Sequence, residues 1–189
     1  MEIKEFIENE RNETTDHCKR VAKYIEMFFK YDDLNFTDEE KRCIIKGAYL
    51  HDIGKAYVDD NILYKEGKLT TNEFQKVKEH SLLGYEILIE NKKFFKTQKE
   101  WKICSEIVLL HHKKIDGSGY PSIKIKKIPL YVQLVSIVDI FDVLTTPRCY
   151  KKAYSKEEAI AIIKNGECGA FNKRLTNGLK KYLTVIESC

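Results

Sequence analysis

The residues best suited to chemistry in this 189-residue chain are histidines and aspartates in apolar surroundings. The pair His51-Asp52 falls at the end of a predicted helix, and Asp139 lies in the middle of the most apolar stretch of the chain. A buried carboxylate requires a cation or hydrogen-bond donors. The residues that could provide such a site together are His51, Asp52, His80, His111, His112 and Asp139.

This combination of imidazole and carboxylate groups indicates a metal centre. Mixed histidine and carboxylate ligands suit Fe, Mn, Zn or Ni rather than Ca. Ligands carried by several helices would meet inside a helical bundle. The alternative, a set of unrelated core histidines and turn aspartates, explains a lone His-Asp pair well but a constellation of this size poorly. The fifth histidine, His17, is four residues after Glu13, so both face one way on the first helix, either as ligands or as an exposed pair.

The elements that must position these side chains are predicted to be helices. Apolar residues recur at helical spacing, and Thr37/Glu40, Thr70/Glu73 and Ser155/Glu158 have the spacing of N-terminal caps. Without strong period-two alternation, the sequence predicts an all-α fold. The expected helices cover residues 12–30, 37–51, 70–87, 99–112, 130–144, 155–166 and 172–187, with a loop over 112–128 that contains Asp-Gly-Ser-Gly.

Composition limits the class of protein. The chain is 43% hydrophobic and 33% charged, which predicts one globular domain over residues 1–189. The apolar stretch 130–144 is interrupted by polar residues, and the N-terminus does not resemble a signal peptide, so we expect a cytoplasmic protein outside the membrane. The six cysteines form no C-x-x-C pair and are expected to be reduced thiols. A net charge of +4 with scattered lysines fits a small anionic substrate and nucleic-acid binding equally well, and we expect no nucleic-acid polymer as a partner.

Several motifs in succession resemble those of HD-GYP domains. They run from about Asn12 to Leu175, and the D-G-x-G-Y-P loop makes the resemblance specific. In chain order the motifs are Glu13-Thr-Thr-Asp-His17, Leu50-His-Asp-Ile-Gly-Lys55, Asn61-Ile-Leu-Tyr-Lys-Glu-Gly-Lys-Leu69, His80, His111-His112, Asp116-Gly-Ser-Gly-Tyr-Pro121, Asp139-Ile-Phe-Asp-Val-Leu144, Arg148-Cys-Tyr-Lys151 and Gly169-Ala-Phe-Asn172.

The resemblance implies a helical bundle around two or three divalent metal ions, with Fe or Mn favoured over Zn or Ni. It also implies hydrolysis of cyclic di-GMP, through a metal-bound hydroxide, to the linear dinucleotide pGpG or to GMP. The implied metal ligands are His51, Asp52 as a bridge, His80, His111, His112 and Asp139, with Glu13 and His17 at a third ion. Lys55 would contact the scissile phosphate, Arg148 and Lys151 would hold the substrate phosphates, and Gly119, Tyr120 and Pro121 form the loop that names the family.

Departures from the family pattern leave alternatives open. Lys113 stands where glutamate is usual, Cys149 where proline is usual and Asn172 where aspartate is usual, and the segment after Pro121 lacks the usual glycine. None of these changes removes an expected ligand. The alternatives are a hydrolase for another cyclic dinucleotide such as cyclic GMP-AMP, a nucleotidase, or a catalytically weak binding module. The Gly-Tyr-Pro loop is a candidate surface for a protein partner, and oligomeric state cannot be predicted.

Overall fold

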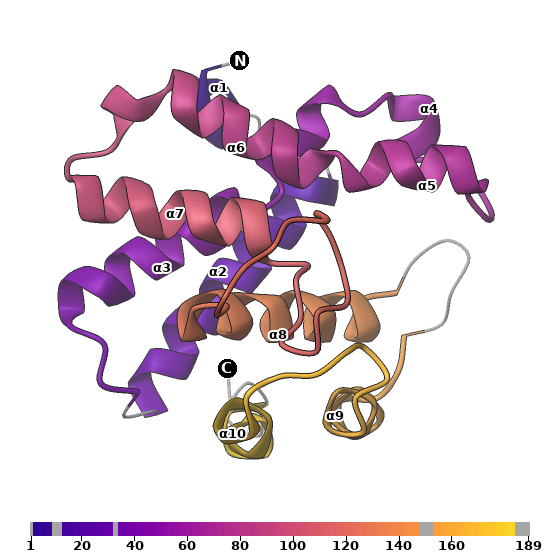
Figure 1. Cartoon of the computed structure of the whole chain (residues 1–189). Helices are drawn as coiled ribbons and strands as arrows, with labels where there is room; N and C mark the ends of the chain where they lie inside the picture. The colour runs from indigo at the N-terminus through magenta and orange to yellow at the C-terminus, as the bar shows by residue number, and fades with distance from the viewer. Residues whose placement is uncertain (1, 9–12, 32–33, 148–152, 184–189) are drawn as a thin grey trace.

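The computed structural model describes residues 2–8, 13–31, 34–147 and 153–183, and in these residues the chain is built from helices without a strand. The all-α prediction is therefore confirmed. The longer helices are α2 (Glu13–Tyr31), α3 (Asp38–Leu50), α5 (Thr71–Lys78), α6 (His80–Glu90), α7 (Gln98–Leu110), α8 (Leu130–Thr145), α9 (Lys156–Lys164) and α10 (Lys173–Leu183). Figure 1 shows α8 crossing below α6 and α7, with α9 and α10 viewed end-on beneath it.

The helices begin where the sequence provides caps. Thr37, Thr70 and Ser155 each accept a hydrogen bond from the backbone N–H three residues later, and the glutamate at that position bonds back to the cap. Each of these capping boxes provides hydrogen-bond acceptors for backbone N–H groups that a helix N-terminus otherwise leaves unpaired. These three predicted helix starts are confirmed.

One apolar core joins the central helices. It is formed mainly by α2, α3, α7 and α8, and buries Val21 and Ile25 of α2 together with Ile44 of α3 and Ile107 of α7. The same core extends to Phe141 of α8, one of the largest fully buried side chains. Because these four helices share a single core, the positions that carry the candidate ligands are held in fixed relation to one another.

The predicted third helix differs from the structure, because the chain bends at Glu79 and forms α5 and α6 instead. Helix α5 buries none of its residues, and Phe74 remains 46% exposed, so the apolar spacing in its sequence does not reflect packing against the core. The bend makes His80 the first residue of α6. Short elements that the sequence did not predict are α1 (Ile3–Glu8), α4 (Asp60–Leu63) and two 3₁₀ helices, η1 (Ile53–Tyr57) and η2 (Lys92–Phe94).

Two glycines bring the backbones of η1 and α6 together. A Cβ added at Gly54 would lie 1.9 Å from the carbonyl oxygen of His80 and 2.5 Å from the amide nitrogen of Gly84. Only glycine permits so close an approach. This contact places η1, which directly follows Asp52, against the first turn of α6, which carries His80.

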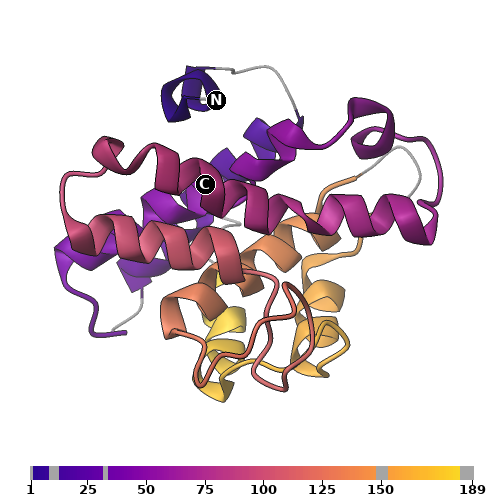
Figure 2. The ribbon, with the colours of Figure 1, turned by 45° about the horizontal axis from the view of Figure 1, so that its top comes forward.

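The loop between α7 and α8 is packed against the C-terminal part of the chain (Figure 2). The N–H of Ile115 donates to the carbonyl of Ala170 at 3.2 Å, and the N–H of Ala170 donates to Asp116 at 3.0 Å. The N–H of Asn172 donates to the side chain of Gln133 on α8 at 2.9 Å. In the described part of the chain, no helix is long and apolar enough to cross a membrane.

Candidate metal centre

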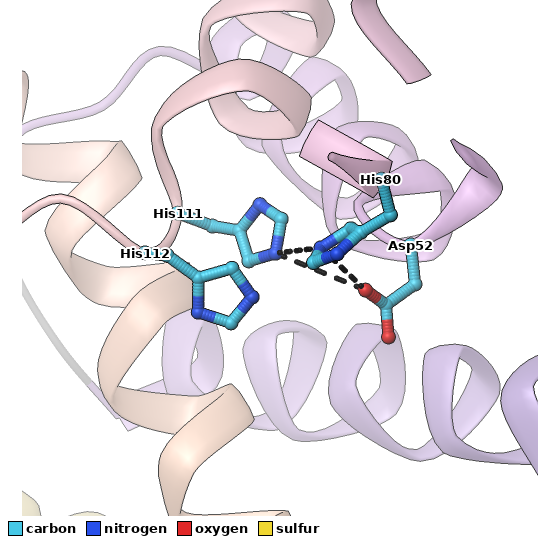
Figure 3. Close-up of side chains that lie close together, drawn as sticks. All are labelled: Asp52, His80, His111 and His112. Atoms are coloured by element: carbon cyan, nitrogen blue, oxygen red, sulfur yellow. Dashed lines mark hydrogen bonds and ion pairs between the residues drawn. The ribbon is translucent and has the colours of Figure 1, made fainter. Parts of the chain in front are cut away.

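Four side chains from three parts of the chain form a first group, and Figure 3 shows them turned toward one another. They are Asp52 after α3, His80 at the start of α6, and His111 and His112 after α7. His80 Nε2 lies 3.2 Å from Asp52 Oδ1 and 3.3 Å from His111 Nε2. All except His112 are buried, so the group faces inward and could surround an ion.

A second group lies beside the first and consists of His17 on α2, His51 after α3, and Asp139 on α8. His17 Nε2 is 3.1 Å from Asp139 Oδ1 and 3.2 Å from His51 Nε2. All three side chains are buried. The structure thus places His17 with His51 and Asp139.

Asp52 stands between the two groups. Its Oδ1 faces the first group, 3.2 Å from His80 Nε2 and 3.8 Å from His111 Nε2. Its Oδ2 faces the second, 3.4 Å from His51 Nε2 and 3.8 Å from His17 Nε2. A carboxylate with one oxygen toward each group has the arrangement needed to bridge two cations.

The hydrogen bonds of the histidines orient them as ligands. Nδ1 of His51 donates to the carbonyl of Ala48 at 2.7 Å, and Nδ1 of His80 donates to the carbonyl of Val77 at 2.7 Å. Because a carbonyl oxygen only accepts, the proton must lie on Nδ1, so Nε2 of each neutral ring presents a lone pair. His111 is held in the same way through the carbonyl of Val108.

These lone pairs identify a good cation site. With the proton on Nδ1, His80 and His111 point two acceptors at each other across 3.3 Å. Two buried acceptors in that arrangement satisfy each other poorly, whereas a divalent cation between such groups would accept both lone pairs. The residues therefore fit a metal on the chemistry of the donor set.

The pKa values of the candidate ligands are shifted by burial and by neighbouring charges. Burial lowers the pKa of His111 well below its usual range and that of His112 to about 3, which keeps both rings neutral. Burial also lowers the pKa of His17, but hydrogen bonds to Asp139 and Asp142 outweigh it and raise that pKa to about 9. Burial opposes ionisation of Asp52, yet Lys55 and the nearby histidines hold its pKa well below the usual range. Without a cation, His17 supplies part of the positive charge that the carboxylates require.

Asp142 and Arg20, for which no role was predicted, hold His17 in place. Asp142 Oδ2 accepts from His17 Nδ1 at 2.7 Å. Arg20 donates to both oxygens of Asp142, at 2.8 and 2.9 Å. A carboxylate behind a ligand histidine fixes the ring and makes it a better donor. The available signals were spacings of three, from His17 to Arg20 and from Asp139 to Asp142.

Cys18 is a further neighbour of the site with no predicted role. Its Sγ lies 3.8 Å from Nδ1 of His51. Burial raises the pKa of Cys18 well above its usual range, so the sulfur stays a thiol and is a weak ligand. Cys18, Cys43 and Cys104 are free thiols, as predicted, while Cys149 and Cys189 lie outside the described residues.

A cavity of about 290 Å³ opens beside the second group. Its lining includes Glu13, His17, Arg20 and Lys55, together with Tyr64 after α4. Lys55 Nζ lies 2.6 Å from Asp52 Oδ2, and although burial opposes it, this carboxylate raises the pKa of Lys55. The predicted residues Glu13 and Lys55 thus border the same cavity, next to the candidate ligands.

The Gly-Tyr-Pro loop contacts the first group through its tyrosine. The ring of Tyr120 stacks on His112 with a centroid separation of 4.3 Å. Gly119 has φ +79°, and a Cβ there would lie 1.9 Å from the carbonyl oxygen of His112, so glycine is required at this position. Pro121 is buried, and the peptide bond between Tyr120 and Pro121 is cis.

Lys113, which stands where the family usually has glutamate, is buried, and its Nζ lies 3.3 Å from the carbonyl oxygen of Gly117. The predicted phosphate-binding residues Arg148 and Lys151 lie outside the described residues.

Comparisons with known proteins agree with this geometry. The family model described as HD domain matches residues 3–170. A cyclic di-GMP phosphodiesterase of Vibrio cholerae is 38% identical over 92% of this chain and 35% of its own length. A 3′3′-cGAMP-specific phosphodiesterase 2 of the same organism is 35% identical over 80% of this chain and 28% of its own length. The chain therefore spans about a third of the length of these curated relatives.

A solved structure has the same fold. Bd1817, described as a HDG"Y"P protein from Bdellovibrio bacteriovorus, matches with a TM-score of 0.68 and 22% identity. The match covers 90% of this chain and 52% of that one. At this level of identity the similarity concerns the arrangement of helices.

Proposed function

The chain belongs to the HD domain family, and from that premise we propose that it is a metal-dependent phosphodiesterase that opens cyclic di-GMP. The observation that carries the proposal is the pair of His/Asp groups joined by the two oxygens of Asp52. The names of relatives that act on cyclic dinucleotides support the substrate class. The proposed product is the linear dinucleotide pGpG, followed by GMP if the cut product binds again.

We assign two metal ions to the two groups, with Fe or Mn as the expected metals. His80, His111 and His112 would hold one ion, His17, His51 and Asp139 the other, and Asp52 both. Glu13 lines the adjacent cavity and is the proposed ligand of a further ion. When bound, such ions supply positive charge to the phosphoryl oxygens and Lewis acidity to the attacking water.

The chain's own residues would orient the phosphodiester. Lys55 borders the cavity, and its raised pKa keeps it protonated near neutral pH. Its ammonium can therefore pair with a phosphate oxygen and stabilise the charge that develops there. Arg20 borders the same cavity, but its guanidinium already holds Asp142, which assigns it to positioning His17. Arg148 and Lys151 remain the proposed holders of the substrate phosphates, because Arg offers a planar fork of donors.

Chromatography of reaction products tests the proposal. Protein purified without oxygen and loaded with Mn or Fe(II) should convert cyclic di-GMP to pGpG, and metal analysis of the same sample should find at least two ions per chain. Asp52→Asn should abolish turnover, because it removes the charged group shared by both sites. Asp60→Asn, a matched change at an exposed aspartate on α4, should behave as wild type. If two ions bind and cyclic di-GMP stays intact, the proposal fails.

The second candidate substrate is 3′3′-cGAMP, since a relative of similar identity is named for it. Parallel assays of both cyclic dinucleotides separate the two, because the ratio of kcat/KM for the two substrates measures the preference directly. Cleavage of 3′3′-cGAMP alone would replace the substrate and keep the chemistry. Tight binding of either compound without cleavage would instead identify a binding module.

A further inference from the structure

A second cavity, which we call the lysine pocket, lies on the loop between α7 and α8. Its volume is about 520 Å³, and it shares no lining residue with the cavity beside Lys55. Its walls come from the two ends of the loop, from Gln133 on α8 and from Asn172 before α10. Pockets that bind small molecules have volumes of roughly 300–1,000 Å³. The lysine pocket is thus large enough for a ligand of its own.

Charge is the main property of this pocket. Five lysines line it and none of its lining residues is acidic: Lys113, Lys114, Lys124, Lys126 and Lys127. Three of them, at 124, 126 and 127, are exposed on the loop. Like charges gathered on one short segment repel each other. A bound anion would offset that repulsion.

The two remaining lysines are buried, and their ammonium groups contact neutral partners. Lys113 and Lys114 are 8% and 7% exposed. Lys113 Nζ donates only to the carbonyl of Gly117 at 3.3 Å, and Lys114 Nζ donates to Ser136 Oγ at 2.6 Å and lies over the ring of Phe171. Within the described residues, no carboxylate oxygen lies within 4.0 Å of either ammonium. Buried charges in proteins are normally paired, so Lys113, whose ammonium lies at the pocket residue Gly117, lacks the counter-charge that an anion in the pocket would provide.

The apolar part of the lining narrows the class of anion. Ile115, Ile123 and Ile125 are 50%, 37% and 36% exposed, and Ile128 lies behind them. Isoleucines that alternate with lysines offer an apolar surface beside the charges. A ligand that uses both would carry a phosphate joined to a weakly polar body, and a nucleoside phosphate has both parts. We propose that the lysine pocket is a binding site for a nucleoside phosphate, separate from the metal centre.

The pocket is connected to the metal centre through the loop itself. Lys113 directly follows His112, and the N–H of Lys114 donates to the carbonyl of Ser118 at 3.1 Å. Two residues later Tyr120 stacks on His112. A ligand that holds Lys113 and Lys114 therefore also fixes the segment that supports a proposed metal ligand. Occupancy of the pocket should be felt at the metal centre.

Titration calorimetry with GMP and with inorganic phosphate as probes tests the site on the full, metal-loaded chain. The double variant Lys124→Glu/Lys126→Glu reverses two exposed charges of the pocket. Lys23→Glu/Lys164→Glu makes the same charge change at exposed lysines of α2 and α9 that line neither cavity. GMP affinity should fall by at least about tenfold in the pocket variant, since each charge-assisted phosphate contact is strong. It should change by less than about twofold in the control, where solvent and salt screen the charges.

Two further measurements separate this site from the proposed active site. Asp52→Asn should keep GMP binding to the lysine pocket even if turnover is lost. Lys113→Met, which keeps the length of the buried chain and removes its charge, should weaken GMP binding when its melting temperature matches wild type. The proposal is overturned if GMP does not bind, if the pocket and control variants bind equally, or if Asp52→Asn removes the binding. Equal affinity for inorganic phosphate and GMP would overturn the assignment to a nucleoside phosphate.

Discussion

The close contact between η1 and α6 makes Gly54→Ala a sharp test of how the fold holds the candidate ligands. A Cβ at Gly54 would lie 1.9 Å from the carbonyl oxygen of His80, whereas ordinary contact begins at 3.4 Å. The two backbones would have to separate by about 1.5 Å. Functional geometry tolerates displacements of only about 0.5 Å. We therefore expect Gly54→Ala to pull His80 away from Asp52 and to release the ion between them.

The cost in stability can be worked from the same contact. Overpacking of a core costs roughly 1–3 kcal/mol, and a clash between two backbones belongs at the upper end because neither can rotate away. For a chain of this size that corresponds to a melting temperature about 6–12 °C lower. The fold itself should survive, since the main core of α2, α3, α7 and α8 lies elsewhere.

Gly47→Ala is the matched control on α3. Its Cβ would lie 2.5 Å from Ile107 Cδ1, the end of a side chain, and 3.3 Å from the backbone atom Cys104 Cα, so the backbone contact is much less severe than at Gly54. The gain in helix propensity from Gly to Ala offsets part of the cost. Metal content per chain and melting temperature should be measured for both variants. The reasoning is refuted if Gly54→Ala keeps the metal content and melting temperature of the wild type, or if Gly47→Ala loses metal to the same extent.

Three other perturbations have defined outcomes. Thorough chelation should lower the melting temperature and Mn should restore it, because an ion present at about 100 times its Kd stabilises the folded state by roughly 2.7 kcal/mol per site; unchanged melting would argue against a metal centre. In metal-free protein the free energy of unfolding should fall by about 2 kcal/mol between pH 6.5 and 8, because the folded chain raises the pKa of His17 from 6.5 to about 9 and so holds a proton that the unfolded chain releases. Above pH 8 the free energy of unfolding should rise again, because burial lowers the pKa of Lys114 to about 8. His17→Gln should flatten the fall in the free energy of unfolding below pH 8. Asp142→Asn should weaken metal binding about 10- to 100-fold, because His17 loses its carboxylate partner; an unchanged metal titration would make Asp142 purely structural.

Capping residues and apolar spacing predicted the long helices well. The boxes at Thr37, Thr70 and Ser155 are confirmed, because a cap is a local interaction that the sequence alone determines. The bend at Glu79 was missed, because apolar residues continue at helical spacing through it. The exposed face of α5 shows that periodicity does not report whether a partner surface exists. Only the tertiary arrangement decides that.

The candidate site was predicted as a set of residues but not as a geometry. His51, Asp52, His80, His111, His112, Asp139 and His17 do lie together. Their division into two groups depends on the relative orientation of α2, α3, α7 and α8, which the sequence does not contain. Asp142 and Arg20 were missed because they act behind a ligand. The metal-binding roles of the seven predicted ligands, and a single domain over residues 1–189, stay predictions.

The ends of α3 and α7 have a consequence for the order in which ligands bind. Helix α3 ends at Leu50 and α7 at Leu110, so His51 and His111 sit where each helix presents its last carbonyl groups. Those carbonyls carry partial negative charge, and the carboxylates of Asp52 and Asp139 add full charges nearby. Where His17 and Lys55 offset only part of this negative charge, a cation is favoured over a phosphodiester. We therefore expect compulsory ordered addition, in which the protein gains affinity for its anionic substrate only after the metal has reversed the sign of the local potential.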